Sequence, residues 1–310
     1  MDVISIKNPL LLTSVHKKVV DAGWNATQAR LGERAIEMLG KQILVTEVTT
    51  AHIDALKEKL KEADLTDASI NRFLTAVSKM CKYAYRRYET YHMTSMPYFE
   101  YIPLDNERER YLSQKEEEKL IEVCKSLHDM ETYRDFFLFL LDTGMRKGEA
   151  LGFKVKQVHE HKNEEGRTRL YVRLAGNTTT KKHKRVVPLT PRARAIVEPL
   201  MAKLTDEDVV FDLNYWTVQN RFNDVRTEMG LEDDKEFTLH CLRHTYASRL
   251  VQAGTPLYKV GTLLGHSNPR MTQRYAHFAP TDLLDAIDVL DDFKTSETIA
   301  KPIDNLASIT

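Results

Sequence analysis

Residues 95–112 interrupt the hydrophobic pattern of the chain and so limit the folds open to it. This stretch contains Pro97 and Pro103 and has no sustained helical or strand period, which is typical of a linker between domains. The chain is therefore predicted to fold as two domains rather than around one core. The predicted segments are a flexible start (1–13), a helical domain (14–94), the linker (95–112), a second domain (113–280) and a tail (281–310).

The first predicted domain is helical throughout. Residues 51–63 repeat apolar side chains at helical spacing, and a second amphipathic helix begins near Thr66. Opposite its apolar stripe, this second helix carries basic side chains interleaved with tyrosines. Such a face suits contacts to DNA phosphates, although a merely solvated face has the same composition. The basic residues are Arg72, Lys79, Lys82 and Arg86.

The second predicted domain combines helices with a small antiparallel sheet. Ser113 and Glu116 form a capping box before its first helix, and a very apolar helix follows at 131–142. Residues 171–174 and 185–189 are predicted strands, joined by a polar turn rich in lysine. Further helices are predicted at 215–229 and 239–253, after Thr255, and from Asn268 past Tyr275. The fold class is thus mostly α and multi-domain: an all-α first domain and an α+β second domain.

The balance of charge hides an uneven distribution. Lys plus Arg and Asp plus Glu each number 45, and a formal net charge of zero by itself argues against a nucleic-acid partner. However, residues 281–310 alone sum to −5, while residues 151–190 carry +7 and residues 241–280 carry +5. These basic stretches are either solvated surface or a surface for an anionic partner.

Composition also excludes several classes of protein. The longest apolar run, residues 136–141, is far too short to cross a membrane, and the start of the chain does not resemble a signal peptide. Cys81, Cys124 and Cys241 are too few and too scattered for a disulfide framework or a four-thiolate metal site. We expect an intracellular protein without a membrane segment.

Two groups of polar residues in the second domain contain an arginine suited to an anion. Arg146 follows a glycine turn in T-G-M-R-K-G-E (143–149), and its partner is expected to be either Glu149 or a phosphate. His240 and Arg243 are three residues apart, so they share a helix face near the first turn, where free N–H groups favour an anion.

A third group combines a histidine with a tyrosine. His266 follows Gly265, and Tyr275 lies nine residues later. Each residue alone is more often structural. Together, two arginines, a turn lysine, two histidines and a tyrosine form a phosphate clamp with a nucleophile.

This ordered set resembles the signature of the tyrosine recombinases, also called phage-type integrases. Their pattern is an arginine in T-G-x-R-x-x-E, a lysine on a β-hairpin, H-x-x-R, then L-G-H and a tyrosine about nine residues on. The resemblance covers residues 110–280, and the first domain is similar to the family's core-binding domain in size and position only. Ala150 departs from the larger apolar residue that many members have there.

The resemblance implies a role for each residue. Arg146 and Arg243 would hold the non-bridging oxygens of a phosphodiester. Tyr275 would attack phosphorus, forming a 3′-phosphotyrosyl ester and releasing a 5′ hydroxyl. His240 would be the general base and His266 a donor to the phosphate. Because the ester keeps the bond energy, neither a metal nor another cofactor is expected.

The acid that protonates the leaving 5′ oxygen would be the hairpin lysine. Counting back from residues 186–189, the family's lysine falls at or next to Lys181. Lys181 is therefore the predicted acid, with Lys182 as the alternative. The remaining turn lysines, including Lys184, are predicted to contact DNA phosphates or solvent.

The resemblance also implies an assembly and a setting. A homotetramer would join two double-stranded DNA sites and exchange strands through a Holliday junction, with a possible accessory directionality factor. The expected location is the cytoplasm of a bacterial host, associated with the nucleoid. A phage or mobile-element integrase is expected, the alternatives being a Xer-like dimer resolvase and a type IB topoisomerase. Many phage integrases have an additional amino-terminal domain that binds distant arm sites of the DNA. Residues 1–13 are too few to form such a domain, so none is expected here.

Two other functions fit parts of the sequence. His240, Cys241 and His244 are close enough for a zinc site, but there is no H-E-x-x-H pattern and no second ligand pair at finger spacing. A DNA-binding regulator that does not cut would be expected to lack the nucleophile or an arginine.

The tail has an apolar stripe of its own. Leu283, Leu284, Ile287 and Leu290 fall on one face of a predicted helix. That helix is expected either to pack on its own domain or to dock on a neighbouring protomer.

Overall fold

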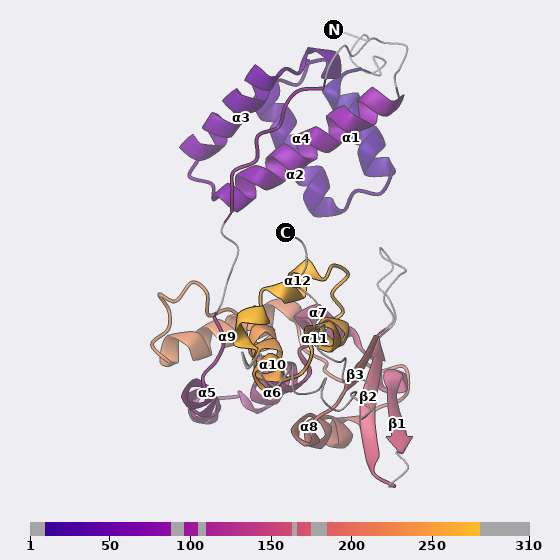
Figure 1. Ribbon diagram of the computed structural model, residues 1–310, viewed down its shortest axis with the longest axis vertical. Coiled ribbons are helices and arrows are strands. Elements are labelled where there is room, and N and C mark those ends of the chain that lie inside the picture. Colours follow the sequence, from indigo (N-terminus) through magenta and orange to yellow (C-terminus); the bar gives the residue numbers. More distant parts are fainter. Residues whose placement is uncertain (1–9, 88–95, 105–109, 163–165, 175–184, 280–310) are drawn as a thin grey trace, which may run out of the picture. The chain divides into compact units, whose positions relative to one another are not determined.

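A computed structural model describes residues 10–87, 96–104, 110–162, 166–174 and 185–279. The chain divides into two compact units, residues 1–106 and 107–310 (Figure 1). No described helix is long and apolar enough to cross a membrane.

The first unit is a bundle of helices around one long central helix. Its elements are α1 (Leu12–Asp21), α2 (Ala26–Leu39), the 3₁₀ turn η1 (Val45–Glu47), α3 (Thr50–Glu62) and α4 (Asp67–Arg87). The other three α-helices all pack on α4. Its apolar stripe, including Ile70, Phe73 and Val77, is fully buried in the core of the unit, as the helical spacing predicts.

The fold begins earlier than the flexible start expected at residues 1–13. Leu11 forms an isolated β-bridge with Leu44, and α1 begins at Leu12, whose side chain is completely buried. A contact between such distant residues leaves no local period in the sequence, so the sequence pattern gave no sign of it.

Much of the predicted linker belongs to one unit or the other. Asn71 of α4 exchanges two hydrogen bonds with the backbone of Ile102, which packs against the first core. Leu112 is buried in the second core, and its backbone N–H donates to the Thr245 hydroxyl. Residues 96–104 lack a period because their partners lie on another element.

The second unit contains eight α-helices and three strands within its described residues. The helices before the sheet are α5 (Gln114–Ser126), α6 (Glu131–Thr143) and α7 (Lys147–Gly152), followed by the 3₁₀ turn η3 (Val155–Gln157). The strands are β1 (Val158–Lys162), β2 (Thr168–Leu174) and β3 (Arg185–Pro188). The elements after the sheet are α8 (Pro191–Met201), α9 (Tyr215–Glu228), α10 (Leu239–Gln252), α11 (Leu257–Leu264), α12 (Arg270–Gln273) and the 3₁₀ turn η4 (Ala276–Phe278).

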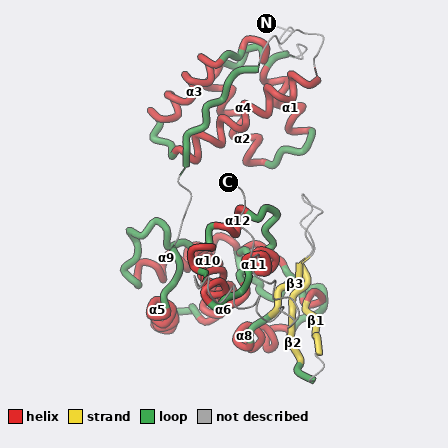
Figure 2. Tube along the Cα trace, in the orientation of Figure 1, coloured by secondary structure: helices red, strands yellow, loops and turns green. Residues whose placement is uncertain are grey.

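The sheet is antiparallel, with the order β1-β2-β3, and its strands lie together at one edge of the second unit (Figure 2). Val172 pairs with Val187, so the alternation in β2 and β3 directs these valines into the core. The sequence did not predict β1, because its residues, V-H-E-H-K, are half-exposed or exposed and lack an apolar alternation.

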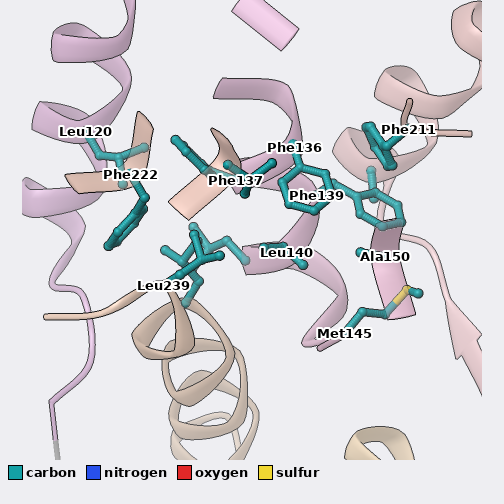
Figure 3. Packing of buried hydrophobic residues seen from close by; sticks show 14 of the residues in the cluster. Leu120, Phe136, Phe137, Phe139, Leu140, Met145, Ala150, Phe211, Phe222 and Leu239 are labelled. Atoms are coloured by element: carbon teal, nitrogen blue, oxygen red, sulfur yellow. The ribbon is translucent and has the colours of Figure 1, made fainter. Parts of the chain in front are cut away.

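The apolar helix α6 lies in the middle of the second core. Phe136 and Phe139 contact Phe211, and Phe137 contacts Phe222, with ring centroids 5.0–5.4 Å apart (Figure 3). Aromatic pairs of this kind add stability beyond the area that they bury. The end of α6 is therefore held firmly where it turns into the first polar motif.

An ion-pair network ties the helices on the outside of this core. Glu117 of α5 accepts one hydrogen bond from Arg192 of α8 at 2.6 Å, and it pairs with Arg249 of α10, also at 2.6 Å. Arg192 also pairs with Asp142 at the end of α6. These contacts fix α10, which carries the second polar motif, against α5, α6 and α8.

Candidate active site

Arg146 is positioned by a glycine turn at the end of α6. Gly144 has φ +59°, and a Cβ there would collide with the ring of Tyr246, so both the conformation and the space require glycine. Arg146 then caps α7: its backbone N–H donates to Glu149 at 2.8 Å, and its Nη1 donates to the same carboxylate at 3.0 Å. The Arg146 side chain is still 43% exposed, so it can also bind an external anion.

Glu149 holds a second arginine, Arg185, the first residue of β3. Nη2 of Arg185 donates to the Glu149 carboxylate at 2.6 Å, and Nη1 donates to the carbonyl of Leu264. The Arg185 side chain is 5% exposed, and burial lowers the pKa of its guanidinium. The sequence gave no sign of this role, because Arg185 was only the first residue of a predicted strand.

Arg243 of α10 reaches the same region, because it shares the Leu264 carbonyl with Arg185. It is 3% exposed, and its two terminal nitrogens donate to the carbonyls of Gly144 at 2.5 Å and of Leu264 at 2.6 Å. Burial, and then the charges of Arg146 and Arg185, lower the pKa of Arg243 to about 9. Three arginines this close repel one another, and a bound anion would relieve that repulsion.

His266 enters the site from the turn that ends α11. Gly265 has φ +67°, and a Cβ there would lie within 2.8 Å of Arg185 Cδ. Nδ1 of His266 is 2.8 Å from the hydroxyl of Thr272, which is buried. Burial, with the surrounding arginines, lowers the pKa of His266 to about 4, so the ring is neutral near pH 7. If Nδ1 accepts from Thr272, Nε2 carries the hydrogen and can donate to an anion.

Tyr275 lies just beyond α12 and not within it as the sequence predicted. The helix ends at Gln273, and Tyr275 begins the η4 turn, with its backbone N–H bonded to the carbonyl of Thr272. Its side chain is 5% exposed in a small apolar cluster that includes Val251, Val260 and Leu264. Burial raises the pKa of its phenol, while Arg243 and Arg274 oppose that rise.

The Tyr275 hydroxyl contacts a histidine that sequence reasoning had considered only as a zinc ligand. The distance from Tyr275 Oη to His244 Nδ1 is 2.6 Å, and the His244 side chain is buried. His240 packs edge-on against His244, with ring centroids 4.9 Å apart. The i, i+4 spacing of the two histidines was the available signal, since it places both on one face of α10. No group of three His, Cys, Asp or Glu side chains that could hold a metal occurs among the described residues.

The lysine turn is the part of the predicted site that falls outside the described residues. Lys181, Lys182 and Lys184 all belong to residues 175–184. This segment joins Leu174 to Arg185, which are register partners at the ends of β2 and β3. Arg146, Arg185 and Arg243 together form the arginine cluster. Because Arg185 begins β3 and contacts Glu149, the described end of β3 lies at this cluster.

The basic residues of the first unit lie on the exposed face of α4. The side chains of Arg72, Lys79, Lys82 and Arg86 are all exposed. Arg72 and Lys79 also line a cavity of about 270 Å³, together with Trp24 and Leu31 of the α2 region. The amphipathic helix therefore has the basic face that its sequence predicts.

Comparisons with known proteins cover the second unit most strongly. The model of the phage integrase family matches residues 110–281. Tyrosine recombinase XerA of Saccharolobus solfataricus is 28% identical over 166 residues, which are 54% of this chain and 51% of that protein. The integrase of Salmonella phage P22 is 27% identical over 57% of this chain and 46% of its own. The chain thus spans about half the length of most of these curated relatives.

Similar solved structures extend the likeness of the fold to both units. The Tn1549 transposon integrase in complex with a circular intermediate DNA has a TM-score of 0.66 at 15% identity, covering 92% of this chain and 100% of that one. A lambda integrase dimer bound to a core site has a TM-score of 0.62 at 19% identity, covering 86% of this chain and 76% of that one.

Proposed function

The chain belongs to the phage integrase family, the tyrosine recombinases, and from this premise we propose that it is a site-specific DNA recombinase. It cuts and rejoins DNA through a 3′-phosphotyrosyl intermediate and a Holliday junction. One observation supports this most: side chains from three separate segments of the chain lie close together. They are Arg146, Arg243, His266 and Tyr275.

The arginine cluster binds the scissile phosphate. The transition state of phosphoryl transfer places more charge on the non-bridging oxygens, and forked donors fixed in advance stabilise that charge. Arg243 is fixed by two carbonyl groups, and Arg146 by Glu149. His266 adds a neutral donor, because its lowered pKa keeps it uncharged.

Tyr275 is the nucleophile. Its oxygen forms a bond to phosphorus as the bond from phosphorus to the 5′ oxygen breaks. The leaving oxygen takes a proton from a hairpin lysine, Lys181 or in the alternative Lys182. His240 is the general base suggested by the H-x-x-R spacing, and its ring lies beside His244. The reverse reaction, by a 5′ hydroxyl of another strand, rejoins the DNA.

Recognition of the DNA site involves both units. The exposed cations of α4, Arg72, Lys79, Lys82 and Arg86, contact phosphates, as do Lys182 and Lys184 of the hairpin. Four protomers hold two duplexes and exchange strands in pairs, with an accessory factor setting direction. Relatives named as phage integrases favour a phage or mobile-element integrase, and those named Xer support the alternative of a dimer resolvase. The reaction takes place in the cytoplasm, on the bacterial nucleoid.

Trapping the covalent intermediate tests this function without knowledge of the target. The purified protein is incubated with fragments of the DNA that flanks its own gene, denatured, and assayed for attached DNA, which is then sequenced. Wild type is expected to carry DNA cut at one sequence, and Tyr275→Phe to carry none while still retarding that DNA in a gel. Tyr258→Phe, which changes an exposed tyrosine, is the matched control.

Three outcomes would contradict the proposal. An adduct formed by Tyr275→Phe would remove the nucleophile assignment. Attachment without sequence preference, together with relaxation of any supercoiled plasmid, would point to a topoisomerase. Binding without any adduct from wild type would point to a regulator that does not cut.

A further inference from the structure

We propose that His244 is the general base that takes the proton of Tyr275 during cleavage. This inference rests on the proposed function, and it moves the base from His240 to the neighbouring helical turn. The main observation behind it is the 2.6 Å contact between Tyr275 Oη and His244 Nδ1. A general base must lie within hydrogen-bond reach of the proton that it takes, and His244 meets this condition.

The contact is buried on both sides, which makes it strong and directional. Tyr275 is 5% exposed and His244 is 8% exposed, so water competes little for either atom. The two residues come from different elements, α10 and the start of η4, which pack against each other. The phenol is therefore aimed at the imidazole by packing of the fold and not by a flexible loop.

The chemistry of the pair gives the direction of the hydrogen bond. Burial raises the pKa of Tyr275, so the phenol is protonated and has one hydrogen to donate. A neutral imidazole with its hydrogen on Nε2 accepts that hydrogen at Nδ1. The lone pairs of Oη that remain are then available to phosphorus.

Positive charge lies close to the pair. Arg243 precedes His244 on α10, and Arg243 and Arg274 both act electrostatically on the Tyr275 phenol. The same group of arginines contributes to the lowered pKa of His266. The negative charge that develops on the phosphate favours a positive charge nearby, at the point where the base must take up its proton.

The step balances as a proton transfer coupled to phosphoryl transfer. The bond from Oη to phosphorus forms, the bond from phosphorus to the 5′ oxygen breaks, and the phenol proton moves to His244 Nδ1. The hairpin lysine supplies a proton to the 5′ oxygen. On rejoining, the lysine takes the proton of the attacking 5′ hydroxyl, and His244 returns its proton to Tyr275.

His244→Asn separates acceptance of a hydrogen bond from acceptance of a proton. The amide oxygen of asparagine is attached to Cγ, as Nδ1 is in histidine, so it can hold the phenol but cannot become protonated at neutral pH. The DNA is a nicked suicide form of the sequence recovered by covalent trapping. We expect unchanged affinity for this DNA and adduct formation about 10² to 10³-fold slower than in wild type.

His240→Asn is the matched control, because it changes the other histidine on the same face of α10. It is expected to form the adduct faster than His244→Asn. His244→Gly supplies a second readout: added imidazole should restore part of its cleavage rate, and more basic imidazoles should restore more. A merely structural role for His244 would give no such dependence on basicity.

The inference is overturned if His244→Asn forms the adduct within about threefold of the wild-type rate, or if His240→Asn alone is slow. It is also overturned if imidazoles fail to rescue a folded His244→Gly that binds DNA. An adduct with wild type in the same experiment shows that the proposed function stands even when this inference fails. Absence of any wild-type adduct would contradict both the role of His244 and the proposed recombinase function.

Discussion

Arg185 and Arg243 donate to the same acceptor, the backbone carbonyl oxygen of Leu264. Leu264 is the last residue of α11 and directly precedes the Gly265-His266 turn. A strand, a helix and a turn that are far apart in the sequence thus meet at one oxygen. The predictions that follow probe this junction and the groups around it.

Replacing Arg185 should destabilise the second unit. Arg185→Met keeps much of the side-chain volume but leaves Glu149 without its buried partner. Breaking a buried ion pair from one side costs about 3 kcal/mol, which urea unfolding of the full chain would measure. Arg169→Met, on an exposed position of β2, is the control and should change little. Equal effects of the two changes would show that Arg185 does not support the site.

Gly265→Ala should destabilise the second unit more than the same change at another glycine with positive φ. Gly265 and Gly254 have φ of +67° and +79°, but only at Gly265 would a Cβ meet Arg185; around Gly254 there is open space. Gly254→Ala should therefore show only backbone strain, about 1 kcal/mol. Gly265→Ala should lose more stability and also slow adduct formation. Indistinguishable unfolding midpoints would contradict the packing of Gly265 on Arg185.

Removing the Thr272 hydroxyl should affect cleavage more than binding. Thr272→Val takes away the partner of His266 Nδ1, so the ring loses its fixed orientation. Loss of a buried hydrogen bond costs about 1–2 kcal/mol, and adduct formation should slow by roughly tenfold. Thr262→Val removes an exposed hydroxyl in α11 and serves as the control. Gel retardation and adduct rates of both variants make the comparison.

The stability of the second unit should decline in mild acid partly through His266. Its pKa is lowered from the usual 6.5 to about 4 when folded, mainly by burial. Between these values the unfolded chain binds the proton and the folded chain does not, so stability falls as pH drops from about 6.5 towards 4. The Tm of His266→Gln should depend less on pH in this range than that of wild type. Parallel Tm curves for the two proteins would argue against a lowered pKa.

The two candidate lysines can be separated by the chemistry of the leaving group. Lys181→Ala should slow cleavage by about 10² to 10⁴-fold if Lys181 protonates the 5′ oxygen. A 5′-phosphorothiolate substrate should restore the rate, because a thiolate leaves without needing a proton. Rescue of Lys182→Ala in place of Lys181→Ala would move the role by one residue.

The sequence predicted best those features that depend on local periodicity and spacing. The apolar stripe of α4, the cap at Ser113 and the end of α6 at Gly144 follow from neighbouring residues, and the structure has all three. The motif spacing also selected Arg146 and Arg243, whose terminal nitrogens the structure brings to one small region. These features need no knowledge of distant contacts.

Features created by distant contacts were missed. Arg185 and His244 contact partners 36 and 31 residues away in the sequence. Arg185 does not stand out by its type or period, and the spacing of His244 from His240 shows a shared helix face but not the contact with Tyr275. The strand β1 carries mostly polar side chains, so its pairing with β2 shows only in three dimensions. Tyr275 was assigned to a helix, but α12 ends two residues earlier, at Gln273.

The burial of Tyr275 has a consequence for anyone who engineers this protein. The side chain packs with Val251, Val260 and Leu264, so it is a core residue as well as the proposed nucleophile. Selection of variants for heat resistance alone would favour larger or differently shaped apolar side chains in this cluster. Such repacking would shift the phenol of Tyr275 from its position. Libraries at these positions should therefore be screened for turnover in parallel with thermal tolerance, since improvement of one property gives no assurance of the other.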